Sequence, residues 1–217
     1  NNYSSAYNDS LGIENLQKYA SLFGLNERTG IEIEEAAPQI ANEFPVMAAI
    51  GQSNNNYTTV QLARYVTAVA NEGTVYQYTL LNRLEDSDGN VLQTFEPQVR
   101  NQIDVLDTEE WNAIHSGMRM VVENTKEFDG FPIEAAGKTG TAQQNLKRPN
   151  HALFVGYAPY DDPEISIATR IAYGYTSHNA AKLARNVFAY YFNVENEDEL
   201  LNGQAANGNS SSNEISD

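Results

Sequence analysis

Residues 137–143 read Gly-Lys-Thr-Gly-Thr-Ala-Gln, which places one cation, two hydroxyls and two glycines in a single short stretch. Glycines leave the backbone of a strand uncovered, so the backbone of an extended ligand can lie close against it. Lys138 offers an ammonium group suited to a carboxylate, and Thr139 and Thr141 add hydroxyl donors and acceptors. The stretch therefore predicts a sheet-edge strand that binds the carboxylate end of an extended peptide. An ordinary strand with a surface lysine is the alternative, which the tripeptide Lys-Thr-Gly alone does not exclude.

Segments on both sides extend this pattern. They read His-Ala-Leu-Phe-Val-Gly-Tyr-Ala-Pro at 151–159, Asp-Asp-Pro-Glu-Ile-Ser-Ile-Ala at 161–168, Ile-Gly-Gln-Ser at 50–53 and Tyr-Thr-Thr-Val-Gln-Leu at 57–62. Together with the Lys-Thr-Gly strand they resemble the penicillin-binding transpeptidases, specifically the class B type of cell elongation and division. That family usually has Gly-Gln-Gly and Thr-Pro-x-Gln where this chain has Gly-Gln-Ser and Thr-Thr-Val-Gln. The resemblance covers residues 1 to about 193.

The resemblance implies a peptidoglycan D,D-transpeptidase, a serine enzyme of acyl transfer that also binds penicillin. In that family a Ser-x-x-Lys motif supplies the nucleophile, a Ser-x-Asn motif stands opposite, and the Lys-Thr-Gly strand closes the third side. The substrate would be a peptidoglycan stem peptide ending in D-Ala-D-Ala. Lys138, Thr139 and Thr141, with Gly140 between them, would bind the terminal carboxylate of that peptide or of a β-lactam antibiotic. The backbone N–H of Thr141 would be one of two oxyanion-hole donors.

The chain departs from the family at the first two motifs. No Ser-x-x-Lys occurs in its 217 residues, so this chain alone is predicted to be inactive. The family's spacing, counted back from Leu11, puts the asparagine of Ser-x-Asn at Asn1, or at Asn2 if the spacing differs by one. Both asparagines are equally explained as a polar terminus. The chain therefore looks like the C-terminal part of a transpeptidase domain. The missing N-terminal part of the same domain would supply the nucleophile. The face of the sheet that its helix leaves exposed would be covered by another chain or segment, or this piece would pack in some other way.

Composition excludes several other classes of function. The formal net charge of -16 argues against nucleic acid and anionic membrane surfaces as direct partners. The chain has no cysteine, which excludes disulfides, thiol catalysis and zinc–thiolate sites. His115, His151 and His178 lack metal-ligand spacing, so we expect no metal and no cofactor. Acidic pairs such as Asp161-Asp162 sit in predicted loops and are interpreted as solvated turns.

The cellular location follows from the resemblance. We expect the intact parent at the extracytoplasmic face of a bacterial membrane, anchored by an N-terminal segment that this chain lacks. No apolar run approaches the roughly 18 residues of a membrane span.

Two other functions share part of the pattern. A serine β-lactamase would carry the same Lys-Thr-Gly strand, but the segments at 50–53 and 151–159 favour the transpeptidase class. A non-enzymatic sensor of β-lactams or muropeptides, or a degenerate pseudoenzyme, would be compatible with the missing nucleophile. Truncation explains that absence more simply.

Hydrophobic periodicity predicts an α+β fold, an antiparallel sheet flanked by helices. The resemblance implies that this is the fold of the penicillin-binding transpeptidases and serine β-lactamases. We expect helices at 11–23, from a Thr58 cap to Gly73, from an Asp107 cap to Asn124, and after a Ser177 cap with residues 180, 184, 187 and 191 on one face. Strands are expected at 29–33, 75–84, 91–95, 134–143, 152–157 and 165–172, and a loop at 34–56. Residues 1–202 would form the transpeptidase part and 203–217 a disordered polar, acidic tail.

Overall fold

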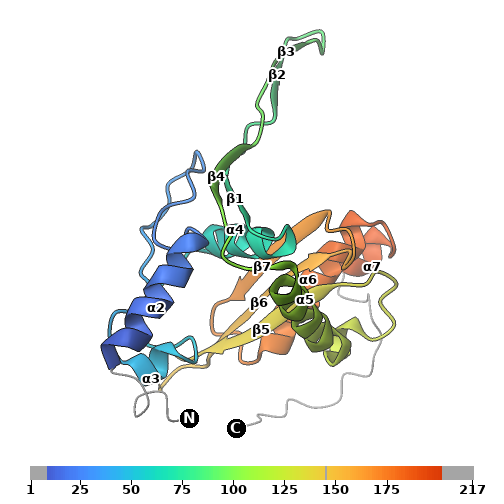
Figure 1. Ribbon diagram of the computed structural model, residues 1–217. Coiled ribbons are helices and arrows are strands. Elements are labelled where there is room, and N and C mark those ends of the chain that lie inside the picture. The colour runs from blue at the N-terminus through green and yellow to red at the C-terminus, as the bar shows by residue number, and fades with distance from the viewer. Residues whose placement is uncertain (1–8, 145, 202–217) are drawn as a thin grey trace.

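The computed structural model describes residues 9–144 and 146–201 of the chain (Figure 1). The helices are α2 (Asp9–Leu22), α3 (Pro45–Ala48), α4 (Thr59–Ala70), α5 (Thr108–Glu123), the 3-10 helix η1 (Lys126–Phe128), α6 (Ser177–Tyr191) and α7 (Glu197–Leu201). The strands are β1 (Thr74–Gln77), β2 (Arg83–Glu85), β3 (Val91–Thr94), β4 (Gln98–Gln102), β5 (Ala136–Ala142), β6 (His151–Ala158) and β7 (Ile165–Ile171). Asn1, Asn2 and the expected tail at 203–217 lie outside the described residues.

The central sheet has the order β5-β6-β7, and both pairs are antiparallel. Its three strands confirm the three predicted between residues 134 and 172, and short connections join them as antiparallel neighbours. Figure 1 shows α4 and α5 on one side of the sheet and α6 on the other. The α+β architecture expected from the sequence is therefore confirmed.

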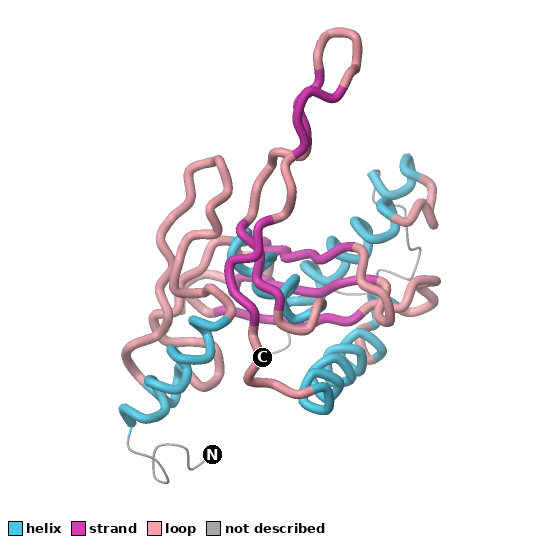
Figure 2. The backbone as a smooth tube through the Cα atoms, turned by 45° about the horizontal axis from the view of Figure 1, so that its top comes forward, coloured by secondary structure: helices cyan, strands magenta, loops and turns pink. Residues whose placement is uncertain are grey.

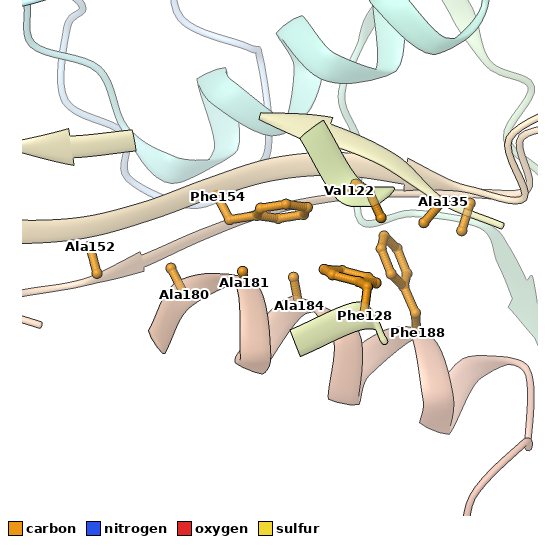
Figure 3. Packing of buried hydrophobic residues seen from close by; sticks show 10 residues of the cluster. Val122, Phe128, Ala135, Ala152, Phe154, Ala180, Ala181, Ala184 and Phe188 are labelled. Atoms are coloured by element: carbon orange, nitrogen blue, oxygen red, sulfur yellow. The ribbon is translucent and has the colours of Figure 1, made fainter. Parts of the chain in front are cut away.

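The core between the sheet and α6 is built from aromatic rings packed on small residues. Figure 3 shows Phe154 of β6 pointing toward the alanines of α6, with Phe128 and Phe188 beside it. The rings of Phe128 and Phe154 stack with centroids 5.7 Å apart. A Cβ on Gly137 would lie 2.3 Å from Cζ of Phe154, so the glycine leaves room for that ring. Any larger side chain at 137 would push β5 away from β6.

The opposite face of the sheet is covered by α4. Its N-terminus has the predicted capping box, in which the Thr58 hydroxyl accepts from the N–H of Gln61 and the Gln61 side chain accepts from the N–H of Thr58. Val66 and Ala70 pack on Ala136 and Tyr157 of the sheet.

The helix α5 begins as predicted with a capping box, formed by Asp107 and Glu110. Its His115 lies 2.7 Å through Nε2 from the carbonyl oxygen of Val69, at the end of α4. The Trp111 side chain is 3% exposed and packs with Val75. His115 therefore joins α5 to the end of α4.

The segment after α2 is held by Arg64, which is 1% exposed and reaches back from α4. Its guanidinium donates to the carbonyl oxygens of Gly24, Glu27 and Arg28, the last two at 3.2 Å. These carbonyls follow the helix end; the contact with Gly24 is buried and the other two are partly buried. One arginine therefore supplies hydrogen-bond donors to three main-chain carbonyls in the segment that follows α2.

Several boundaries differ from those predicted. Residues 29–33 form no strand, because the Glu35 side chain binds the N–H and hydroxyl of Thr29 and curls the segment. The expected 75–84 strand divides into β1 and β2, and β4 was not foreseen. The 34–56 loop contains the short helix α3. The N-cap of α6 is Thr176 and not Ser177, since the Thr176 hydroxyl accepts from the N–H of His178.

The turn at residues 86–90 joins β2 to β3. Strands β2 and β3 pair around it and stand away from the body of the molecule (Figure 2). No helix within residues 9–201, residue 145 aside, combines the length and apolarity needed to cross a membrane.

Candidate active-site strand

The strand β5 is an outer strand of the sheet. Within the described residues it pairs with β6 alone, so its second edge is open. An open edge presents unpaired N–H and C=O groups to which an extended chain can add. The predicted sheet-edge position of residues 137–143 is therefore what the structure shows.

The side chains of β5 alternate between the two faces of the sheet. Lys138 lies opposite Val155 on the face of α4 and α5, whereas Thr139 lies opposite Phe154 on the face of α6. Thr141 shares the face of Thr139. The ammonium and the two hydroxyls therefore flank the open edge from opposite sides, and they converge only on a ligand that lies along that edge.

The main chain of β5 also alternates, and three contacts show which groups face outward. The carbonyl oxygen of Glu134 accepts from the N–H of Tyr160 at 2.8 Å, so residues of even number face β6. The carbonyl oxygens of Ala135 and Thr139 instead accept from the side chains of Arg119, at 3.1 Å, and Lys138, at 2.8 Å. Since N–H and C=O of one strand residue point the same way, the N–H of Thr141 faces the open edge.

The ammonium of Lys138 is exposed and has no carboxylate partner among the described residues; it donates to the Thr139 carbonyl oxygen. Two other exposed cations of this acidic chain do have carboxylate partners: Arg83 pairs with Glu85 at 2.5 Å, and Arg100 with Glu27 at 2.8 Å. Lys138 is therefore a cation available to a ligand at the edge of the sheet.

The neighbouring site residues are placed as follows. Thr139 and Gly140 are half-buried, and Thr141 is exposed. A Cβ on Gly140 would lie 3.4 Å from the Leu153 Cβ, an ordinary contact, so the packing of β6 does not demand glycine here. Because Gly140 has no side chain, the backbone next to Thr141 is left uncovered. Asn1, the third predicted catalytic residue, lies outside the described residues.

The Gly-Gln-Ser segment forms a loop beside α3. Ser53 has a positive φ of 73°, and its hydroxyl donates to the carbonyl oxygen of Glu43. The side chains of Asn54 and Asn55 accept from the backbone N–H groups of Asn42 and Ala41. These contacts join residues 53–55 to residues 41–43 and so close the loop between them.

One residue of this region was not identified from the sequence as part of a site. His151 begins β6 opposite Ala142, the last residue of β5, and it is 6% exposed. In the sequence, His151 stands at the start of a predicted strand, without the spacing of a metal ligand. The residues next to it in the sequence do not indicate what its side chain contacts.

Known proteins share both this fold and this sequence pattern. A family model for the penicillin binding protein transpeptidase domain matches residues 1–189. The peptidoglycan D,D-transpeptidase MrdA of Haemophilus influenzae is 33% identical over an alignment of 227 positions, which covers 88% of this chain and 34% of that protein. The chain thus spans about a third of the length of this curated relative.

Solved structures agree on the fold. Penicillin-binding protein 2B of Streptococcus pneumoniae superposes with a TM-score of 0.74 at 24% identity, over 84% of this chain and 33% of that one. The imipenem acyl-enzyme complex of penicillin-binding protein A from Mycobacterium tuberculosis gives 0.73 at 22% identity, over 85% and 44%. The family model spans most of the chain, and the chain therefore belongs to the penicillin-binding protein transpeptidase family.

Proposed function

We propose that this chain is the C-terminal part of the catalytic domain of a peptidoglycan D,D-transpeptidase that cross-links cell-wall peptides and binds β-lactams. The open edge of β5 carries the proposal, because it combines an ammonium that has no carboxylate partner among the described residues with an outward-facing N–H at Thr141. An extended peptide ending in a carboxylate matches both features. The name of the relative MrdA supports the same reaction.

Some residues of β5 bind the substrate, and one contributes to catalysis. Lys138 pairs with the terminal carboxylate of the D-Ala-D-Ala stem peptide, and the Thr139 hydroxyl donates to it. Gly140 keeps the strand backbone open to the ligand. The N–H of Thr141 donates to the oxygen that becomes negative when the carbonyl is attacked, which lowers the barrier to acyl transfer. The hydroxyl of Thr141 lies beside the same ligand.

The remaining groups come from the N-terminal part of the same domain. A serine of a Ser-x-x-Lys motif attacks the D-Ala-D-Ala carbonyl carbon, and the bond to the terminal D-Ala breaks so that free D-Ala leaves. An amine of a second stem peptide then attacks the acyl-enzyme ester, which transfers the acyl group to that amine and frees the serine. Asn1 is the asparagine of Ser-x-Asn in this proposal. The parent is anchored in the bacterial membrane, works at its extracytoplasmic face and serves cell shape. The chain alone is inactive, since it holds no Ser-x-x-Lys.

Covalent labelling with a fluorescent penicillin tests the proposal. Mass spectrometry should find one stable penicilloyl adduct on the intact domain and none on residues 1–217 alone. Rapid loss of the adduct would indicate a β-lactamase, and an intact domain that takes no label would indicate a pseudoenzyme. An adduct on the 217-residue chain would contradict the assignment of the nucleophile to an upstream motif.

A further inference from the structure

The far end of β5 is tied to β7 by a single imidazole. His151 Nδ1 accepts from the backbone N–H of Tyr173 at 3.1 Å, so this nitrogen carries no proton. The proton of the neutral ring then sits on Nε2, which donates to the Gln144 side-chain oxygen at 2.9 Å. Gln144 lies three residues beyond Thr141, and Tyr173 follows β7. His151 thus links the ends of the two outer strands across the central one.

The turn that receives this contact is itself held firmly. Tyr173 has a positive φ of 55°, and its ring lies 4.9 Å from the imidazole. Its hydroxyl accepts from Arg148 at 2.7 Å, and the carbonyl oxygen of Asn150 accepts from the N–H of Tyr175 at 3.1 Å. Because the loop between β5 and β6 and the turn after β7 are joined at several points, the imidazole anchors Gln144 to a rigid partner.

The β5 ladder needs such an anchor. Its last pair with β6 is Ala142 with His151, and the second edge of the strand is open within the described residues. An outer strand with one paired edge frays from its end. The outward N–H of Thr141 stands one residue before that last pair. A displacement of about 1 Å of such a donor costs on the order of a hundredfold in rate.

We propose that His151 is a positioning residue for the ligand edge of β5, because its neutral imidazole fastens Gln144 to the Tyr173 turn and so fixes the N–H of Thr141. It touches neither substrate nor the reacting atoms. The catalytic part of this statement rests on the proposed function, whereas the fastening of β5 does not.

The groups around the ring favour its neutral form. Arg170 of β7 brings a guanidinium nitrogen to 3.3 and 3.4 Å from the two ring nitrogens, and Arg148 and Lys147 lie in the adjacent loop. Gln144 and Tyr173 complete the surroundings, and no carboxylate contacts the ring among the described residues. Burial, followed by the charge of Arg170, lowers the pKa of His151. A lowered pKa in the folded state means that the fastening is intact at neutral pH and is lost in acid, below the usual range of histidine.

Matched substitutions in the intact domain test the positioning role. His151→Phe keeps a ring but loses both hydrogen bonds, and Gln144→Ala removes the partner that follows β5. Each should raise amide hydrogen exchange at residues 141–143 and lower the second-order rate of penicillin acylation about tenfold or more. His151→Gln, whose amide can reach Gln144, should recover most of that rate and should abolish the acid-induced rise in exchange. His178→Gln is the control, because that exposed histidine pairs with Glu127 and not with Gln144.

The two readouts separate the failure of this inference from that of the proposed function. A domain that takes no penicillin contradicts the transpeptidase assignment, while the exchange measurement still decides the role of His151. Unchanged exchange at residues 141–143 in His151→Phe would overturn the inference. Equal acylation rates of the His151→Phe and His151→Gln variants would also overturn it. A side chain that only packs gives the same rate whether or not its replacement can form the hydrogen bonds.

Discussion

Replacing Lys138 by alanine should lower the second-order rate of β-lactam acylation of the intact domain about 10- to 100-fold. The expected size is that of a charge-assisted hydrogen bond of about 1.5–3 kcal/mol, at one factor of ten for each 1.4 kcal/mol. The melting temperature should not change, because the side chain is exposed and its ammonium donates only to the neighbouring Thr139 carbonyl oxygen within the described residues. Stopped-flow acylation and thermal unfolding measure the two quantities.

Lys182→Ala is the matched control for this prediction. Lys182 is an exposed lysine on α6, away from the open edge of β5, and its loss changes the net charge equally. Its acylation rate should equal that of the unmodified domain. If both lysine variants acylate at the unmodified rate, Lys138 has no role in binding the carboxylate.

Removing the guanidinium of Arg64 should destabilise the domain more than any surface substitution. Arg64→Met keeps the apolar length of the side chain but leaves the carbonyl oxygens of Gly24, Glu27 and Arg28 without a donor. Leaving the buried Gly24 carbonyl and the two partly buried ones without this donor should cost about 3 kcal/mol of unfolding free energy. Urea unfolding followed by circular dichroism measures the loss.

Arg100→Met is the matched control, because it removes an exposed guanidinium where Arg64→Met removes a buried one. Arg100 pairs with the same Glu27 as Arg64 does, but its side chain is 56% exposed and makes a surface salt bridge. Its loss should have a much smaller effect. Equal effects of the two substitutions would mean that the charge pair with Glu27 matters and the buried main-chain contacts do not.

Local signals in the sequence predicted the parts of the fold that depend on neighbouring residues. Both capping boxes, at Thr58 and at Asp107, were predicted from residues three apart, and both are present. The turn at 86–90 follows from its own aspartates, glycine and asparagine in the same way. These features need no information about the rest of the chain.

Features that depend on distant contacts were missed. Residues 180, 184, 187 and 191 were expected on one face of α6, but Val187 and Tyr191 are exposed and Phe188 is buried. The small side chains of Ala180, Ala181 and Ala184 let the helix approach the sheet, and this approach selects Phe188 as the inward residue.

The candidate site was predicted only in part for the same reason. The composition of residues 137–143 indicated the chemistry of Lys138 and its threonines. It did not show that the cation and the hydroxyls lie on opposite faces of the sheet, which follows from the pairing with β6. The contacts of His151 come from Gln144 and Tyr173, which lie on other segments, so no spacing in the sequence could have revealed them.

A crystal structure of the intact domain acylated by a β-lactam would test the role of β5 most directly. We predict that the acyl carbonyl oxygen lies about 2.7–3.1 Å from the backbone nitrogen of Thr141. The carboxylate of the drug should lie between the Lys138 ammonium and the Thr139 hydroxyl. An acyl group whose carbonyl and carboxylate contact other segments, with the edge of β5 left solvated, would contradict the assignment of this strand as the ligand-binding edge.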